Sequence, residues 1–282
     1  MKKKNIIALA LSALLCLSLL TACGGKKNDS QTVGGTKDGV TIVLVGVIGT
    51  NNEQWDTVNK LLEKDNIRCE LVEYSAYNVP NDALSAKEID LNAFQHKAYL
   101  NGEVADHGYE LTTLCNTFIA PLSIYSDKIT SLDQLKEGDK VAVPQDATNE
   151  GRCFKILESA GVLKVDPAAG YTPELKDITE NPLKLEFVEM EAAYTASSIP
   201  DVAIAFVNGQ HAQDNGLNLA DAVYTEKADT ESDNPYINIV ACRTDEVDNE
   251  VYKKVAEAYQ TAEVAQAINE IFGGRFIPAF EY

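Results

Sequence analysis

The chain has 282 residues, 45% of them hydrophobic and 24% charged, and its 24 basic against 43 acidic side chains give a formal charge of −19. This is the composition of a globular protein with one large or two smaller domains, and it excludes wholesale disorder and collagen-like structure. The acidity argues against nucleic-acid binding, which needs basic side chains, and three histidines are too few for a His-rich metal carrier.

Residues 1–22 are typical of a secretory signal peptide. Three lysines at positions 2–4 are followed by an apolar run over residues 6–20, and the small residues Thr21 and Ala22 precede Cys23. This lipobox pattern of bacterial lipoproteins predicts cleavage before Cys23 and a diacylglyceryl group on its sulfur. An uncleaved transmembrane anchor is the alternative, but the apolar run is shorter than the roughly 20 residues that a span requires.

Residues 23–39 are rich in Gly, Lys, Asn, Asp, Ser and Thr and show no apolar periodicity, so we predict a flexible tether. No later stretch is long and apolar enough to cross a bilayer. The sequence therefore predicts a folded body that the lipid on Cys23 anchors to the extracytoplasmic face of the cell membrane.

From residue 40 onward, strand-like and helix-like segments alternate. Apolar or β-branched runs predict strands over residues 40–48, 68–74, 89–93, 109–119, 140–143, 183–190, 202–207 and 236–242. Amphipathic or capped segments predict helices over residues 51–62, 80–87, 95–107, 131–136 and 148–160, and two more between 247 and 272. The alternation favours a parallel α/β architecture, and about ten strands suit two sheets better than one.

Polar and aromatic side chains that follow the predicted strands are the candidate binding residues, because ligands of α/β proteins bind at the carboxyl ends of strands. Near the start of the helix that begins at residue 148, Arg152 offers a two-pronged contact to a carboxylate, with Asn149 beside it. The other candidates are Tyr74, Tyr77, Phe94, His96, Tyr99, Asn208 and Asn238. For each group a structural role is the alternative: a solvated arginine, packed rings, a satisfied histidine or an asparagine bonded to backbone.

Patterns of catalytic or redox chemistry are absent from the sequence. There is no G-x-S-x-G, H-E-x-x-H, P-loop or G-x-G-x-x-G motif, and the cysteines lack C-x-x-C spacing, so we expect no enzyme, cofactor or metal site. Cys69, Cys115 and Cys242 lie in apolar strand-like runs and are interpreted as small buried hydrophobic residues. The redox state of these three cysteines and of Cys153 stays open.

Four stretches of the body resemble the NLPA-type lipoproteins, the methionine-binding components of ABC importers. They are NVPNDALSAKEIDLNAFQHKAYL (78–100), VAVPQDATNEGR (141–152), NPLKLEFVEME (181–191) and SDNPYINIVACR (232–243). The similarity extends in the same order from residue 40 to residue 274. Its most specific part is the combination of NAFQHKxY with PxDxTNxGR.

The resemblance implies an α/β, two-lobed periplasmic-binding-protein fold of type II with the ligand cleft between its lobes, and no enzymatic activity. Residues 40–120 and 243–282 would form lobe I, and residues 121–242 lobe II. By resemblance, Arg152 would hold the ligand carboxylate, with Asn149 beside it. The remaining roles would be hydrogen bonds to the amino and carboxylate groups from Asn208 and Asn238, and a wall around the thioether chain from Tyr74, Tyr77, Phe94, His96 and Tyr99.

The resemblance further implies delivery of the ligand to a membrane permease whose cytoplasmic ATPase drives uptake. Methionine is the expected ligand, and a methionine-containing dipeptide or another small apolar amino acid is the alternative. The sequence departs from the family at Ala76, where an acid is common, at His211, where a tyrosine is common, and in the turn over residues 49–55. Alternatives from other classes are an anchored α/β hydrolase and a surface adhesin.

Overall fold

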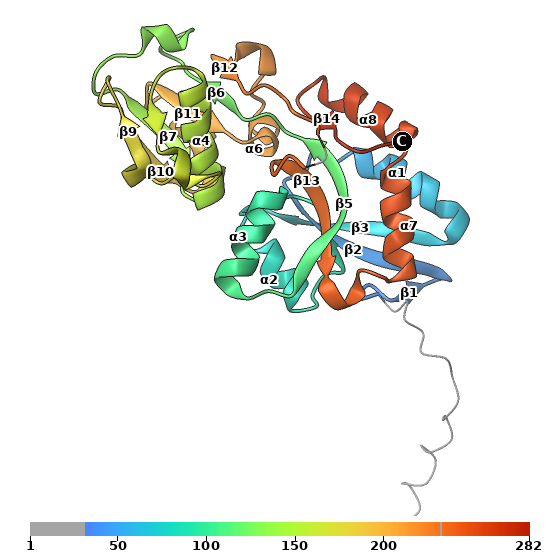
Figure 1. Cartoon of the computed structure of the whole chain (residues 1–282). Coiled ribbons are helices and arrows are strands. Elements are labelled where there is room, and N and C mark those ends of the chain that lie inside the picture. The colour runs from blue at the N-terminus through green and yellow to red at the C-terminus, as the bar shows by residue number, and fades with distance from the viewer. Residues whose placement is uncertain (1–31, 232) are drawn as a thin grey trace, which may run out of the picture. The chain divides into compact units, whose positions relative to one another are not determined.

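The computed structural model describes residues 32–231 and 233–282, which fold into two main β-sheets with helices packed against them (Figure 1). The strands are β1 (Thr36–Lys37), β2 (Val40–Ile48), β3 (Ile67–Tyr74), β4 (Leu91–Asn92), β5 (Leu111–Ile119), β6 (Ser123–Tyr125), β7 (Lys140–Pro144), β8 (Lys164–Val165), β9 (Ile178–Glu180), β10 (Glu186–Met190), β11 (Ile204–Val207), β12 (Tyr224–Thr225), β13 (Ile237–Arg243) and β14 (Ile277–Pro278). The α-helices are α1 (Gln54–Leu62), α2 (Pro80–Ser85), α3 (Lys97–His107), α4 (Ala147–Ser159), α5 (Ala192–Thr195), α6 (Gly209–Asp214), α7 (Glu250–Tyr259) and α8 (Ala262–Phe272). The helix expected over residues 131–136 is a single 3-10 turn, Leu132–Gln134, capped by Ser131.

The first sheet has seven strands in the order β1-β2-β4-β13-β5-β14, and β3 also pairs with β2. It is mixed, because β2 is parallel to β3 and β4 whereas β13 is antiparallel to both β4 and β5. The predicted parallel pairing therefore holds for β2, β3 and β4 but not for β13. Helical crossovers force parallel pairing, but β13 arrives by a long irregular connection from the second sheet and is free of that constraint.

The second sheet has five strands in the order β10-β7-β11-β6-β12, with a parallel half (β10, β7, β11) and an antiparallel half (β6, β12). The chain passes from β5 of the first sheet into β6 of the second through residues 120–122, and it returns through residues 226–236 (Figure 1). Strand β13 thus belongs to the first sheet, although residues up to 242 were expected in lobe II. The chain crosses back to the first sheet within the polar stretch that precedes β13, and not after this strand.

Both faces of each sheet are covered by helices, which explains the apolar strands. In the first sheet, Val43, Val45 and Val47 alternate toward α1, α7 and α8, where they share a core with Trp55 and Tyr259. The opposite face packs on α2 and α3. In the second sheet, α4 covers one face, and α5 and α6 flank the other, so each sheet has its own core. A two-lobed α/β architecture follows from these separate cores.

Residues 32–39 belong to the folded body and correct the expected extent of the tether. Thr36–Lys37 pairs with the start of β2, and the buried Thr32 hydroxyl donates to the Ile42 carbonyl. The backbone N–H groups of Val33 and Gly34 donate to the buried carboxylate of Asp90. Sequence composition misses this packing because its hydrogen bonds go to Ile42 and Asp90, which are distant in the sequence. The signal peptide, Cys23 and tether residues 23–31 lie outside the described residues.

The four cysteines of the described body, Cys69, Cys115, Cys153 and Cys242, are free and buried. Burial raises the pKa of the Cys115 and Cys242 thiols to about 12. The interpretation of Cys69, Cys115 and Cys242 as small buried hydrophobic residues is confirmed, because these thiols stay protonated at neutral pH.

Candidate functional site

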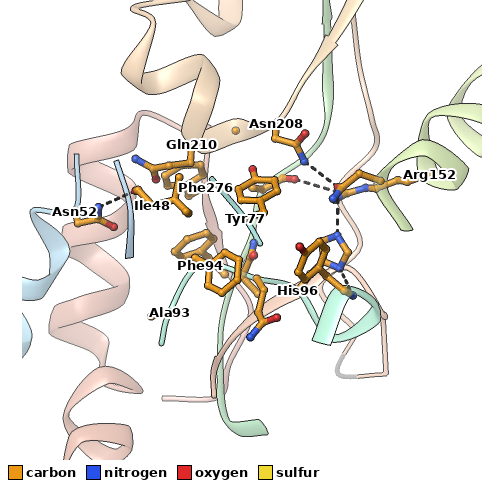
Figure 2. A pocket seen from close by; sticks show the side chains of 17 residues that line it. Ile48, Asn52, Tyr77, Ala93, Phe94, His96, Arg152, Asn208, Gln210 and Phe276 are labelled. Carbon is orange, nitrogen blue, oxygen red and sulfur yellow. Dashed lines mark hydrogen bonds between the residues drawn. The ribbon is translucent and has the colours of Figure 1, made fainter. Parts of the chain in front are cut away.

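A cleft of about 610 Å³ is lined by side chains that come from both sheets (Figure 2). Residues before and within α3 contribute one wall, α4 and the β11–α6 junction contribute another, and β13 closes the base. Eight of the nine predicted binding residues line it: Tyr77, Phe94, His96, Tyr99, Asn149, Arg152, Asn208 and Asn238.

Tyr74 is the predicted residue that the structure separates from the others. It is the last residue of β3 and lines a different, more open cavity together with Glu73, His211 and Asp214. Tyr77, three residues later, has left the strand and reaches the cleft. The sequence shows two tyrosines near the end of one strand, but it does not show on which side of the turn each ring lies.

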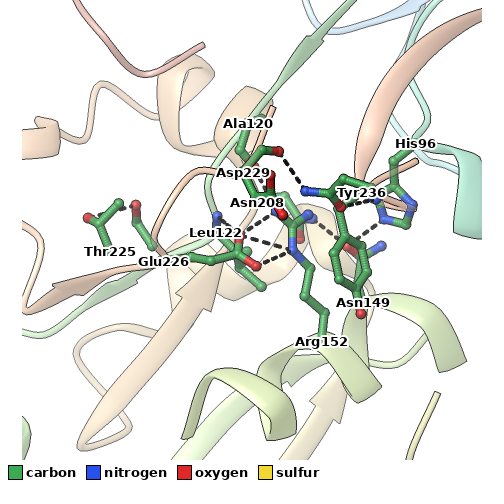
Figure 3. Close-up of polar contacts among 12 residues, drawn as sticks. His96, Ala120, Leu122, Asn149, Arg152, Asn208, Thr225, Glu226, Asp229 and Tyr236 are labelled. Carbon is green, nitrogen blue, oxygen red and sulfur yellow. Dashed lines mark hydrogen bonds and ion pairs between the residues drawn. The ribbon is translucent and has the colours of Figure 1, made fainter. Parts of the chain in front are cut away.

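Arg152 is 3% exposed and lies in the first half of α4, where every residue from Thr148 to Phe154 is buried. Its Nε lies 3.2 Å from both carboxylate oxygens of Glu226, and its Nη2 lies 2.5 Å from Oε2 of the same side chain (Figure 3). Nη2 also donates to the carbonyl oxygen of Ala120 at 3.1 Å, and the ring of Tyr236 lies 4.4 Å from Cζ. A cation–π contact and a charged pair therefore hold the guanidinium in one orientation.

A chain of hydrogen bonds orients the amide groups opposite Arg152. Asp146, the N-cap of α4, accepts from the backbone N–H of Asn149 and from its Nδ2 at 2.9 Å. The Oδ1 atom of Asn149 is thereby turned toward Nδ2 of Asn208, which donates to it at 2.8 Å. The Oδ1 atom of Asn208 is buried and has no donor within reach in the described part of the chain. A buried acceptor without a partner is costly, so this atom marks where a ligand N–H group fits.

His96 belongs to the same network and its tautomer follows from it. The N–H of Tyr99 donates to Nδ1 at 3.0 Å, so the ring proton is on Nε2, which faces Oδ1 of Asn149 at 3.3 Å. Burial, and then the positive charge of Arg152, lower the pKa of His96 to about 3. His96 is thus neutral near pH 7. Its Nδ1 atom caps α3 and its Nε2 atom faces Asn149, and the residue lines the cleft.

Aromatic rings form the apolar wall. The ring centroids of Tyr77, Phe94 and Tyr99 are 5.9–6.0 Å apart in tilted or edge-to-face arrangements. The His211 ring lies 4.9 Å from the Tyr77 ring, centroid to centroid, in a tilted arrangement. Rings at these separations give a polarizable surface suited to an apolar or thioether chain.

Sequence reasoning missed several residues that hold the site in place. The buried side chains of Asn81, Asn92 and Gln95 are hydrogen-bonded to one another and fix the turn that carries Phe94 and His96. Asp146, Glu226 and Tyr236 orient the polar groups, and Asn52, Gln210 and Phe276 complete the lining. Glu226 has no local signal, because it lies 74 positions from Arg152 in an irregular segment.

His211 gives rise to a prediction about pH. Burial lowers its pKa to about 4, against the opposing effect of Asp214, whereas an unfolded histidine titrates near 6.5. Between these values the unfolded chain binds the extra proton, so the contribution of His211 to stability falls as the pH drops from about 6.5 to 4, by roughly 1.4 kcal/mol per pH unit. Urea unfolding across this range should show a shallower decline for His211→Gln.

Neither a metal centre nor a membrane span is found in the described residues. No group of three or more His, Cys, Asp or Glu side chains within residues 32–231 and 233–282 is placed to hold a metal ion. In the same part of the chain, every helix is too short or too polar to cross a bilayer.

Comparison with known proteins assigns the family. The sequence model of the NlpA lipoprotein family matches residues 43–280. A D-methionine-binding lipoprotein MetQ of Salmonella typhimurium is 39% identical over 269 residues, which cover 94% of each chain. The crystal structure of a methionine-binding protein MetQ is 38% identical with a TM-score of 0.80, over 86% of this chain and 99% of its own. A nutrient-binding protein of Burkholderia cenocepacia, solved bound to methionine, is 35% identical with a TM-score of 0.79, over 84% of this chain and all of its own. The chain belongs to the NlpA lipoprotein family.

Proposed function

We propose that this protein is the substrate-binding lipoprotein of an ABC importer and that it captures methionine as a zwitterion. The observation that carries the proposal is the pairing, within one cleft, of the fixed Arg152 guanidinium with the unpartnered Oδ1 of Asn208. The first suits a carboxylate and the second suits an ammonium group. The methionine-binding relatives support methionine as the ligand.

The residues of the cleft contact different parts of methionine. Arg152 binds the carboxylate, assisted by Asn238 on β13, and Asn208 accepts from the ammonium group. Asn149 and His96 keep the Asn208 amide in its orientation. The thioether chain lies against Tyr77, Phe94 and Tyr99. Tyr74, which lines another cavity, is assigned no contact.

The lobes close on the ligand because its contacts are shared between them. The lobe on the first sheet comprises residues 32–120 and 237–282, and the other comprises the residues of the second sheet between them. Arg152 and Asn208 come from the second sheet and the aromatic wall from the first, so only a closed cleft offers every contact. Ligand binding therefore shifts the population toward the closed form, which delivers methionine to a permease with a cytoplasmic ATPase. Lipid on Cys23 keeps the protein at the membrane.

Isothermal titration calorimetry with the purified body tests this function. Both enantiomers of methionine should bind more tightly than leucine or alanine, because the aromatic wall favours a thioether. A methionine-containing dipeptide that binds more tightly than methionine would instead assign the cleft to peptides. Absence of binding to every amino acid and dipeptide would overturn the proposal.

The aromatic wall has its own test in Phe94→Ala. Loss of the ring removes apolar contact with the methionine side chain and should weaken methionine binding by roughly 1–3 kcal/mol. The affinity for alanine, which does not reach the wall, should change much less. Calorimetry with the two ligands gives the comparison, and an equal loss for both would contradict a side-chain role for Phe94.

A further inference from the structure

The Arg152 guanidinium is already paired with a carboxylate of the protein itself. Glu226 occupies its Nε–Nη2 edge and is held from behind by the backbone N–H of Leu122, which donates to Oε2 at 3.1 Å (Figure 3). Glu226 does not line the cleft, whereas Arg152 does. Among the described residues no hydrogen bond uses Nη1 of Arg152, so this nitrogen is the one left for a ligand.

The other side chains of the cleft add no charge. Of the 17 lining residues, Arg152 is the only one that is charged near pH 7, since His96 is neutral. The nearest carboxylate to the amide network, Asp146, lies behind Asn149 and is bonded to it. The charge next to the place proposed for a ligand carboxylate therefore depends mainly on Arg152 and Glu226, with Asp146 behind Asn149.

We propose that Glu226 is a specificity-determining residue that cancels the charge of Arg152 and thereby makes the cleft select a zwitterion over the corresponding anion. A lone buried cation attracts every small carboxylate. Beside Glu226 the guanidinium keeps its Nη1 donors for a ligand but little net charge, so a ligand gains little from a negative charge alone. An ammonium group is then needed for tight binding. This inference rests on the proposed capture of an amino acid in the same cleft.

The decisive ligand pair is methionine and 4-(methylsulfanyl)butanoate, its anionic analogue without the amino group. In Glu226→Gln the charge of Arg152 is no longer cancelled, while one side-chain oxygen still accepts from it. The analogue should gain affinity relative to methionine by about tenfold or more, because a charge a few ångströms away is removed. Calorimetry, with displacement of methionine for weak binding, measures the ratio of the two dissociation constants.

The chain offers a matched control in Arg243 and Glu246. This pair is also close, 2.6 Å between Nη2 and Oε2, with side-chain exposures of 5% and 25% against 3% and 18% for Arg152 and Glu226. Arg243 does not line the cleft, so Glu246→Gln removes the same charge without changing the site. It should leave the ratio unchanged. Glu226→Asp, which keeps the charge, should retain a ratio close to that of the wild type.

A measurement on the wild-type protein tests the inference even if the variants do not fold. With Glu226 in place, 4-(methylsulfanyl)butanoate and its uncharged primary amide should bind within about tenfold of each other. A much stronger preference for the acid would overturn the inference, as would an unchanged ratio in Glu226→Gln or the same shift in Glu246→Gln. Failure of the proposed function is distinct, since the wild-type protein would then bind neither methionine nor its analogues.

Discussion

Replacement of Arg152 by alanine should weaken methionine binding by about 2–5 kcal/mol, the usual cost of removing one member of a buried charged pair. Two effects add. The carboxylate of the ligand loses its donor, and the carboxylate of Glu226, held 3.1 Å from the Leu122 amide, stays near the cleft without its partner and repels the ligand. Calorimetry should show the loss for every amino acid that carries a free carboxylate.

A double substitution separates these two effects. Arg152→Ala with Glu226→Gln removes the repulsion but not the missing donor, so it should recover part of the lost affinity relative to Arg152→Ala alone. Arg152→Lys keeps the charge but not the planar contact with Glu226 and Tyr236, and it should bind with intermediate affinity. Unchanged affinity in Arg152→Ala would remove this residue from the site.

The sequence predicts the order of the elements well because buried strands and amphipathic helices have local signatures. Strand β2 spans the predicted residues 40–48, and the helix predicted from 148 differs from α4 by one residue at each end. The direction of pairing is not local. Strand β13 reads as any other apolar run, and only its partners β4 and β5 make it antiparallel and place it in the first sheet.

The candidate site shows the same difference between local and long-range features. Most of the predicted residues line the cleft, including Asn208 immediately after β11. Residues that orient them were missed, because their role depends on a partner distant in sequence. Glu226 is an ordinary acidic residue in a chain with 43 of them until it is seen against Arg152. Asp146 caps α4, and its bond to the Asn149 side chain gives it a second role that only the structure reveals.

Replacement of Asp90 by alanine should have the largest effect on stability. Its carboxylate is fully buried and accepts four hydrogen bonds, from the N–H groups of Val33, Gly34 and Leu44 and from the Tyr252 hydroxyl. Without it these donors stay buried and unpaired, which should lower the free energy of unfolding by about 3–5 kcal/mol. Urea unfolding measures this loss.

Asp90 also separates stability from binding, because it joins the N-terminal segment to β2 and α7 but does not line the cleft. Asp90→Asn keeps one acceptor oxygen and should lose less stability than Asp90→Ala. In both variants the fraction that is folded should bind methionine with the affinity of the wild type. If methionine affinity fell in proportion to stability, the segment over residues 32–37 would be coupled to the cleft, and the packing of this segment could no longer be treated as independent of ligand binding.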